Sequence, residues 1–156
     1  STTEVLVPNC QTPLALNFSS VENWIALSCQ NEDRARVFVL DLSGSDVRSS
    51  SWDLSTGFNA PIALEFDVAQ DVLLVVASGS EGDHEVLALK IEAQSAELSL
   101  SLIQSWSLGQ GGGIRTLHRA AGVDRFIGLA DEPRLLRFQP YLGTPACIET
   151  SVQTDP

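Results

Sequence analysis

Two nearly identical hexapeptides, PLALNF at residues 13–18 and PIALEF at residues 61–66, lie 48 positions apart in this chain of 156 residues. Four of their six positions agree. Other segments recur in the same order: SWDL at 51–54 returns as SWSL at 105–108, and WIAL at 24–27 aligns with FIGL at 126–129. Self-similarity at a period of about 50 residues indicates a repeat architecture, and this constrains the fold more than any other feature.

Each copy consists of segments with the pattern of β-strands. Short or alternating apolar runs rich in Val, Ile and Phe are separated by Gly, Ser, Asn and Asp clusters. Four such segments occur in the first copy and four in the second, and a third copy holds three. The expected strands lie near residues 13–18, 24–29, 36–42 and 51–55, then 61–66, 72–78, 85–92 and 97–108, then 113–118, 125–131 and 134–140.

A period of about 50 residues with four strands is typical of β-propeller blades. A four-stranded antiparallel blade has two apolar faces and cannot cover either one alone, so blades stack face to face around an axis. We therefore predict an all-β fold, a partial β-propeller of about three four-stranded antiparallel blades. A β-sandwich would explain the number of strands but not their recurrence in fixed order.

The repeats also predict the boundaries of each unit. Residues 1–12 would hold a strand from a preceding blade, 13–56 the first blade, 57–108 the second, 109–140 a degenerate third blade and 141–156 an irregular tail. Propellers have roughly four to eight blades, so three cannot close a ring. We expect the remaining blades to come from the parent chain or another chain, and the lack of methionine suggests a processed or excised piece. The isolated chain should expose an apolar blade face and associate.

Two segments of the first copy carry a resemblance to WD40 repeats. ALNFSSVENWIALSC, residues 15–29, resembles the inner strand, polar turn and second strand of that family. VFVLDLS, residues 37–43, stands where the family ends a strand in Trp-Asp. Leu40-Asp41 replaces Trp-Asp in the first copy and Leu89-Lys90 in the second, and both lack the Gly-His signature. The resemblance implies divergent WD-repeat blades.

Among WD-repeat proteins, residues 22–42, ENWIALSCQNEDRARVFVLDL, are similar to one blade of a particular family. This family is the non-catalytic WD-repeat subunit of the tRNA guanine-N7 methyltransferase. The resemblance implies a scaffold in tRNA processing that stabilises a methyltransferase partner and contributes no catalytic residue. Such a protein would reside in the cytoplasm or nucleus.

The charge of the chain is unevenly distributed. The net charge of −11 lies entirely within residues 1–100, which hold fifteen acidic residues against four basic ones. A strongly acidic surface repels phosphate, so we expect no direct nucleic-acid contact from the acidic blades. The simplest role of this charge is solubility.

The third copy, in contrast, is rich in basic residues. Our candidate partner-binding residues are Arg115, His118, Arg119, Arg134 and Arg137. They could form a docking face for an acidic partner or a limited RNA contact, or they could be scattered surface residues facing the acidic blades. Arg134 and Arg137 are three positions apart in a strand and should point to opposite faces, which argues against a single patch.

Catalytic chemistry has little support in the sequence. An enzyme of this architecture needs polar groups on the inner strands, which offer Asn17, Glu65 and His118, too few to favour catalysis. The exchange of Asn17 for Glu65 between the two hexapeptides instead marks a polar slot. We therefore expect a non-enzymatic interaction scaffold in an intracellular complex. The alternative is a ligand-binding or catalytic β-propeller with a site on the central channel.

Other candidate motifs have simpler interpretations. EGDHEV, residues 81–86, could bind a cation or act as an acid–base cluster, but a solvated turn explains it better. GQGGG, residues 109–113, lacks the context of a phosphate-binding loop and predicts a linker between blades. We expect neither a metal nor a cofactor, and no run is long enough to span a membrane. Three widely spaced cysteines favour reduced thiols and an intracellular location.

Overall fold

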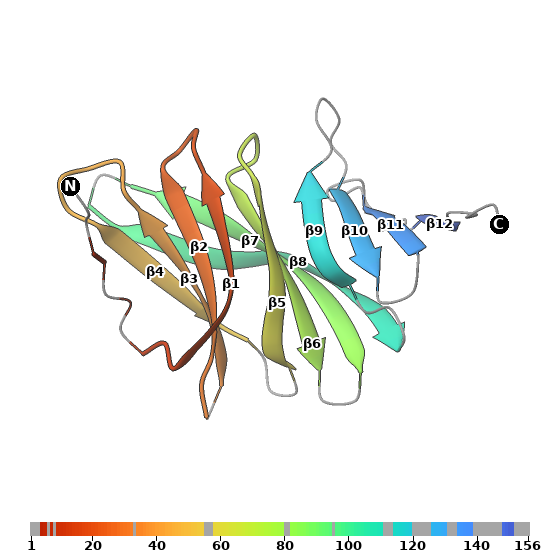
Figure 1. Ribbon diagram of the computed structural model, residues 1–156. Helices are drawn as coiled ribbons and strands as arrows, with labels where there is room; N and C mark the ends of the chain where they lie inside the picture. Colours follow the sequence, from red (N-terminus) through yellow and green to blue (C-terminus); the bar gives the residue numbers. More distant parts are fainter. Residues whose placement is uncertain are drawn as a thin grey trace.

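The computed structural model describes residues 4, 5, 7, 9–32, 34–54, 58–79, 82–94, 96–110, 114–119, 126–130, 134–138 and 148–151. Every regular element among them is a β-strand, and the strands form three antiparallel four-stranded sheets. Each sheet contains four strands that follow one another in the chain (Figure 1). The prediction of an all-β chain with four-stranded antiparallel units is therefore confirmed. Within the described ranges, no helix has the length and apolar character needed to cross a membrane.

The strands follow the order of the sequence in every sheet. Sheet 1 consists of β1 (Thr12–Ser19), β2 (Trp24–Gln30), β3 (Ala35–Asp41) and β4 (Arg48–Asp53). Sheet 2 consists of β5 (Phe58–Asp67), β6 (Val72–Gly79), β7 (Asp83–Ala93) and β8 (Leu98–Gln110). Sheet 3 consists of β9 (Ile114–Arg119), β10 (Phe126–Ala130), β11 (Arg134–Phe138) and β12 (Ile148–Ser151).

The turns after the first strands of sheets 1 and 2 repeat one local geometry. Asn23 and Asp71, 48 positions apart, have φ angles of 54° and 51°, in the left-handed region that Asn and Asp tolerate. The carbonyl of Asn23 accepts a hydrogen bond from the backbone N–H of Leu42 (3.0 Å), and that of Asp71 accepts one from Ile91 (2.7 Å). The two copies thus share their turn chemistry as well as their strands.

Sheet 2 lies between the other two sheets and has both faces buried. One face packs on sheet 1 in a core that includes Trp24, Ala26, Val37 and Val39 of sheet 1 with Leu64, Phe66, Leu73, Val75, Leu87 and Leu89 of sheet 2. The other face contributes Ala63, Leu74, Ala88 and Trp106 to a second core that contains Leu117 of β9. This position explains the apolar run VLLVVA in β6, all six residues of which are buried.

The tryptophan motif that recurs along the sequence has a structural counterpart. Trp52 in β4 lies opposite Val37, and Trp106 in β8 lies opposite Val86, at matching places in the two sheets. Trp24 and Trp106 are buried, and Trp52 packs against the core between sheets 1 and 2. All three therefore act as packing residues. Residues 51–53 of SWDL and all of SWSL belong to the fourth strands of their sheets, as the repeat predicted.

Both ends of the chain differ from the expected boundaries. For residues 1–12 we expected a strand, but the described residues Glu4, Val5 and Val7 lie outside any strand, and Thr12 already belongs to β1. For residues 141–156 we expected an irregular tail, but Ile148–Ser151 forms β12 and pairs with β11. An edge strand can be held largely by backbone hydrogen bonds, so its sequence need not show an apolar pattern. The predicted linker is also shorter, since Gly109 and Gln110 belong to β8.

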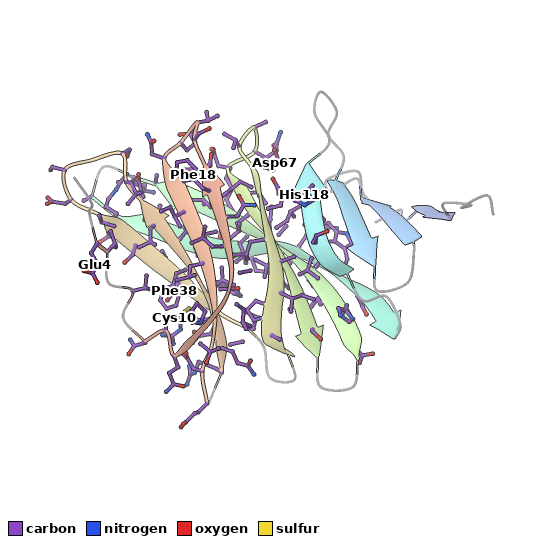
Figure 2. The ribbon with its side chains drawn as sticks, viewed as in Figure 1. Glu4, Cys10, Phe18, Phe38, Asp67 and His118 are labelled. Carbon is purple, nitrogen blue, oxygen red and sulfur yellow. A yellow bond between two sulfur atoms is a disulfide. The ribbon has the colours of Figure 1, made fainter. Side chains whose placement is uncertain are left out.

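Residues 9–11, called here the N-terminal strap, are attached to sheet 1 by covalent and polar bonds. A disulfide joins Cys10 to the fully buried Cys29 of β2 (Figure 2). The amide of Asn31 donates to the Asn9 carbonyl (2.7 Å), and its carbonyl oxygen accepts from the Gln11 N–H (2.9 Å). The expectation of reduced thiols is therefore wrong for this pair. Sequence spacing could not reveal it, because the strap must fold back over the sheet before the two sulfurs meet. Cys147 lies outside the described residues.

Candidate functional site

A polar row crosses the first strands of the three sheets. Strand β5 contacts β1 on one side and β9 on the other. Asn17 of β1 donates from Nδ2 to the Leu64 carbonyl (2.8 Å) and to Oε2 of Glu65 in β5 (3.3 Å). Nδ1 of His118 in β9 lies 3.9 Å from the same Glu65 oxygen. The structure thus brings together the three polar residues that the sequence placed on the inner strands.

The members of the row differ in their access to solvent. The side chain of Glu65 is only 16% exposed, whereas that of His118 is 77% exposed. The separation of 3.9 Å exceeds hydrogen-bond length, so the contact becomes an ion pair only when the imidazole is protonated. The row therefore presents a carboxylate that is held in place by Asn17 beside an accessible imidazole. It can receive a polar or cationic group.

The polar slot in the hexapeptides is the sequence signal behind this row. In β1 the side chains alternate, with Leu16 and Phe18 exposed and Asn17 between them half-buried. Glu65 occupies the matching place in β5, 48 positions later. The sequence showed that the slot is polar, but its members bond to one another because sheet packing places β1 next to β5. The slot is therefore a contact between sheets.

The basic candidate residues all belong to sheet 3. Arg115, His118 and Arg119 lie in β9, and Arg134 and Arg137 lie in β11. His118 is opposite Ile127 of β10, which is opposite Arg137, so these positions share one cross-strand row. Arg134 is opposite Ser151 of β12. The register places His118 and Arg137 in a common row and separates Arg134 from it.

A second polar feature, which the sequence did not reveal, links the outer parts of sheets 1 and 2. Arg48 at the start of β4 pairs with the carboxylate of Asp41 and donates to the carbonyl of Gln94 in the β7–β8 connection. The Asp41 side chain is only 1% exposed, and its Oδ1 accepts the backbone N–H of Ser43 (2.9 Å). We call this group the Asp41–Arg48 clamp.

Electrostatics at the clamp favour the ionised carboxylate. Burial acts to raise the pKa of Asp41, but the hydrogen bonds from Ser43 and Arg48 and the charge of Arg48 together lower this pKa below 3.8.

An open cleft of about 520 Å³ adjoins the clamp, lined by Ser43, Gly44, Ser45, Asp46, Arg48, Ala93, Gln94 and Ala96. Because the Arg48 guanidinium already pairs with Asp41 and donates to the Gln94 carbonyl, the clamp mainly stabilises the contact between sheet 1 and sheet 2.

The described part of the motif at residues 81–86 places its histidine at the start of a strand. Gly82 has a φ of 79° and precedes β7, which Asp83 begins, so His84 lies in a strand rather than the expected turn. Its ring Nδ1 lies 3.1 Å from the Gly82 carbonyl, and the side chain is largely buried. Across the described part of the chain, nowhere do three or more His, Cys, Asp or Glu residues gather in a way that could hold a metal ion.

Comparison of the chain with protein-family models, with curated proteins and with solved structures finds no match. The geometry of the sheets and of their exposed residues therefore carries the functional argument.

Proposed function

We propose that this chain is a partial β-propeller of about three divergent WD-type blades that acts as a non-catalytic scaffold in an intracellular complex. Its sheets follow one another in the order of the chain, and their first strands lie together, with β5 between β1 and β9. The outer strands β4 and β8 also contact each other. Blades around a common axis bring their innermost strands together in this way, which supports the propeller arrangement.

The observation that carries the scaffold role is the apolar surface of β1. The side chain of Leu16 is 67% exposed and that of Phe18 is 53% exposed, beside the half-buried Ile25 and Leu27 of β2. Contiguous exposed apolar side chains mark sites of protein association. A surface of this kind suits a protein partner better than a small polar substrate.

For the partner we propose an RNA-modifying methyltransferase subunit, on the basis of the resemblance of residues 22–42 to the WD-repeat subunit described above. The proposed contact residues are Arg115, His118, Arg119, Arg134 and Arg137 in sheet 3, facing an acidic surface of the partner protein. The acidic sheets 1 and 2 would make no direct contact with tRNA. The complex would bind no cofactor through this chain.

Affinity purification of the tagged chain from cell extract, followed by mass spectrometry and a methyl-transfer assay, tests this proposal. We expect a methyltransferase to be recovered and the complex to methylate tRNA with labelled S-adenosylmethionine, while the chain alone transfers no methyl group. Methyl transfer by the isolated chain, or purification without any methyltransferase, would contradict the proposal. The double variant Arg134→Glu/Arg137→Glu should reduce recovery of the partner.

A second candidate function rests on the polar row. The contacts of Glu65 with Asn17 and His118 favour a ligand-binding or catalytic site on the central channel. The variant Glu65→Gln separates the two functions, because Glu65 is not among the proposed partner contacts and glutamine keeps the size of the side chain while it removes the charge. If the chain is a scaffold, recovery of the methyltransferase and tRNA methylation by the complex should be unchanged. A catalytic role of the carboxylate requires that activity be lost.

The intracellular location is a separate part of this proposal, and the disulfide between Cys10 and Cys29 argues against it. Disulfides persist in oxidising compartments and are rare in the cytosol and nucleus. Alkylation of free thiols at the moment of cell lysis, followed by mass spectrometry of the chain, shows whether Cys10 and Cys29 are reduced or joined in the cell. An intracellular protein should carry alkyl groups on both cysteines, whereas a protected disulfide would place the chain in an oxidising compartment.

A further inference from the structure

Equivalent residues in sheets 1 and 2 differ sharply in exposure. Leu64 and Phe66 in β5 are 5% and 4% exposed, whereas their counterparts 48 positions earlier, Leu16 and Phe18 in β1, are 67% and 53% exposed. The local sequence and strand register are nearly the same in both places. The difference therefore arises because sheet 1 covers Leu64 and Phe66, while no described part of the chain covers Leu16 and Phe18 to the same degree.

The sheets pack in a head-to-tail manner. We call the face that carries Leu16 and Phe18 in sheet 1, and Leu64 and Phe66 in sheet 2, the leading face, and the opposite face the trailing face. The leading face of sheet 2 packs on the trailing face of sheet 1, in the core described above. Leu117 of sheet 3 packs in turn on the trailing face of sheet 2. It corresponds to Leu16 and Leu64, because each of the three lies two positions after the residue skipped at the register shift of its strand. Sheet 3 is thus displaced by one residue from the alignment of WIAL with FIGL. Each contact therefore joins unlike faces.

This pattern defines what fits the open surface. The leading face of sheet 1 is open over β1 and part of β2, while on β3 its residues Phe38 and Leu40 are already buried. In both contacts between sheets of this chain, a leading face packs on a trailing face. By the same pattern, the open leading face of sheet 1 would be covered by the trailing face of another four-stranded sheet. Sheet 3 is the last of the three sheets and lies at the other end of the row from sheet 1 (Figure 1).

We propose that a second copy of this chain covers the leading face of sheet 1 with its sheet 3, so that two copies close a ring of six sheets. The inference rests on the partial propeller proposed above. Contacts between unlike faces form rings when the rotation between units closes, and six sheets lie within the range of roughly four to eight blades. The same contact occurs twice in the ring and leaves neither leading face open.

Charge favours this arrangement over a simple stack of two leading faces. Residues 1–54, which contain sheet 1, hold seven acidic residues and three arginines, whereas residues 114–151, which contain sheet 3, hold five arginines and four acidic residues. The ring places the acidic sheet of one copy against the most basic sheet of the other. Face-to-face stacking would place two acidic sheets together, and like charges across an interface disfavour association.

Sedimentation equilibrium of the non-reduced chain at micromolar concentration tests the proposal. We expect a mass of 33.6 kDa, twice the 16.8 kDa of one chain. The double variant Leu16→Glu/Phe18→Glu should raise the dissociation constant by roughly 30-fold or more, since it places two charges at the centre of the contact. The control Ile103→Glu alters a side chain of similar exposure, 51%, in β8 and should leave the mass unchanged.

Further variants establish the direction of packing. In the head-to-tail ring, Ile127→Glu in sheet 3 should also weaken the dimer, because Ile127 is opposite His118, next to Leu117, and so takes the position of the trailing face. A dimer that is sensitive to the Leu16 and Phe18 changes but insensitive to Ile127→Glu would indicate face-to-face stacking and overturn the ring. A monomer, or a dimer unaffected by Leu16→Glu/Phe18→Glu, would overturn it as well. If circular dichroism shows that the Glu variant is unfolded, Leu16→Ser/Phe18→Ser replaces it with the same expectation.

The outcome is separable from that of the proposed function. A monomer that still recovers a methyltransferase from extract would reject the second copy and retain the scaffold. A dimer that recovers no methyltransferase would reject the proposed partner and retain the ring.

Discussion

Replacement of Arg48 by methionine should destabilise the fold by breaking the Asp41–Arg48 clamp. The change removes the pairing with Asp41 and the hydrogen bond to the Gln94 carbonyl, while the apolar stem of the side chain is retained. Loss of one partner of a buried ion pair costs about 3–5 kcal/mol because the other charge remains buried. The Arg48 side chain is 27% exposed, and Ser43 still donates to Asp41. We therefore expect a loss of about 2–3 kcal/mol in the free energy of unfolding.

Urea unfolding followed by tryptophan fluorescence at fixed protein concentration measures this loss. In the wild-type chain the pKa of Asp41 lies below its ordinary value of 3.8. Its stabilising contribution is therefore present above the pKa of the unfolded state and is lost as the pH falls through the folded pKa. The difference between Arg48→Met and wild type should be largest near neutral pH and shrink as the pH falls through the acid range in which Asp41 becomes protonated.

Two controls make the reasoning refutable. The double variant Asp41→Asn/Arg48→Met removes the buried charge and should be more stable than Arg48→Met alone. Arg36→Met breaks the pairing with Asp53, whose side chain is 37% exposed, and should cost about 1 kcal/mol or less. If Arg48→Met lies within about 0.5 kcal/mol of wild type at every pH, the clamp contributes no more than an ordinary surface pair and the argument fails.

Three further predictions follow from the packing and the strap. Cys10→Ser removes a disulfide that joins residues 19 positions apart and should lower the free energy of unfolding by about 3 kcal/mol, measured by urea unfolding. If the reduced wild-type chain were as stable as the oxidised one, a structural role of the disulfide would be contradicted. Leu64→Ala should cost about 2–5 kcal/mol in the same assay, whereas Leu16→Ala should change the stability of the monomer by less than about 0.5 kcal/mol; similar losses for both would show that the two positions are covered alike. Asn17→Ala removes two hydrogen bonds of the polar row and should cost about 1 kcal/mol, with thermal melting at neutral pH as the readout and no change as the refuting result.

Several features of the fold were predictable from the residues alone because they depend on local pattern. The alternation of side chains in a strand has a period of two, so PLALNF and PIALEF indicated which residues share a face. Asn23 and Asp71 could be placed in turns because these residue types tolerate the left-handed region that tight turns require. The recurrence of these patterns in fixed order was enough to predict four-stranded antiparallel units.

Other features could not be predicted because they depend on contacts between distant segments. β12 has a short and mostly polar sequence, and only the free edge of β11 gives it a partner. The disulfide depends on the strap folding back to β2, and the clamp on the β7–β8 connection approaching β4. Each of these contacts joins residues whose spacing in the chain carries no signal about their distance in space.

The two hexapeptides show both kinds of feature, those set by local sequence and those set by tertiary contacts. Their sequence by itself determined that both segments are strands, that Leu16 matches Leu64 and Phe18 matches Phe66, and that the residue between them is polar. Only the tertiary structure decided that Leu64 and Phe66 are buried while Leu16 and Phe18 are exposed, and that Asn17 bonds to Glu65. The physical reason is that strand periodicity is a property of the local backbone, whereas burial of a sheet face depends on whether another sheet lies against it.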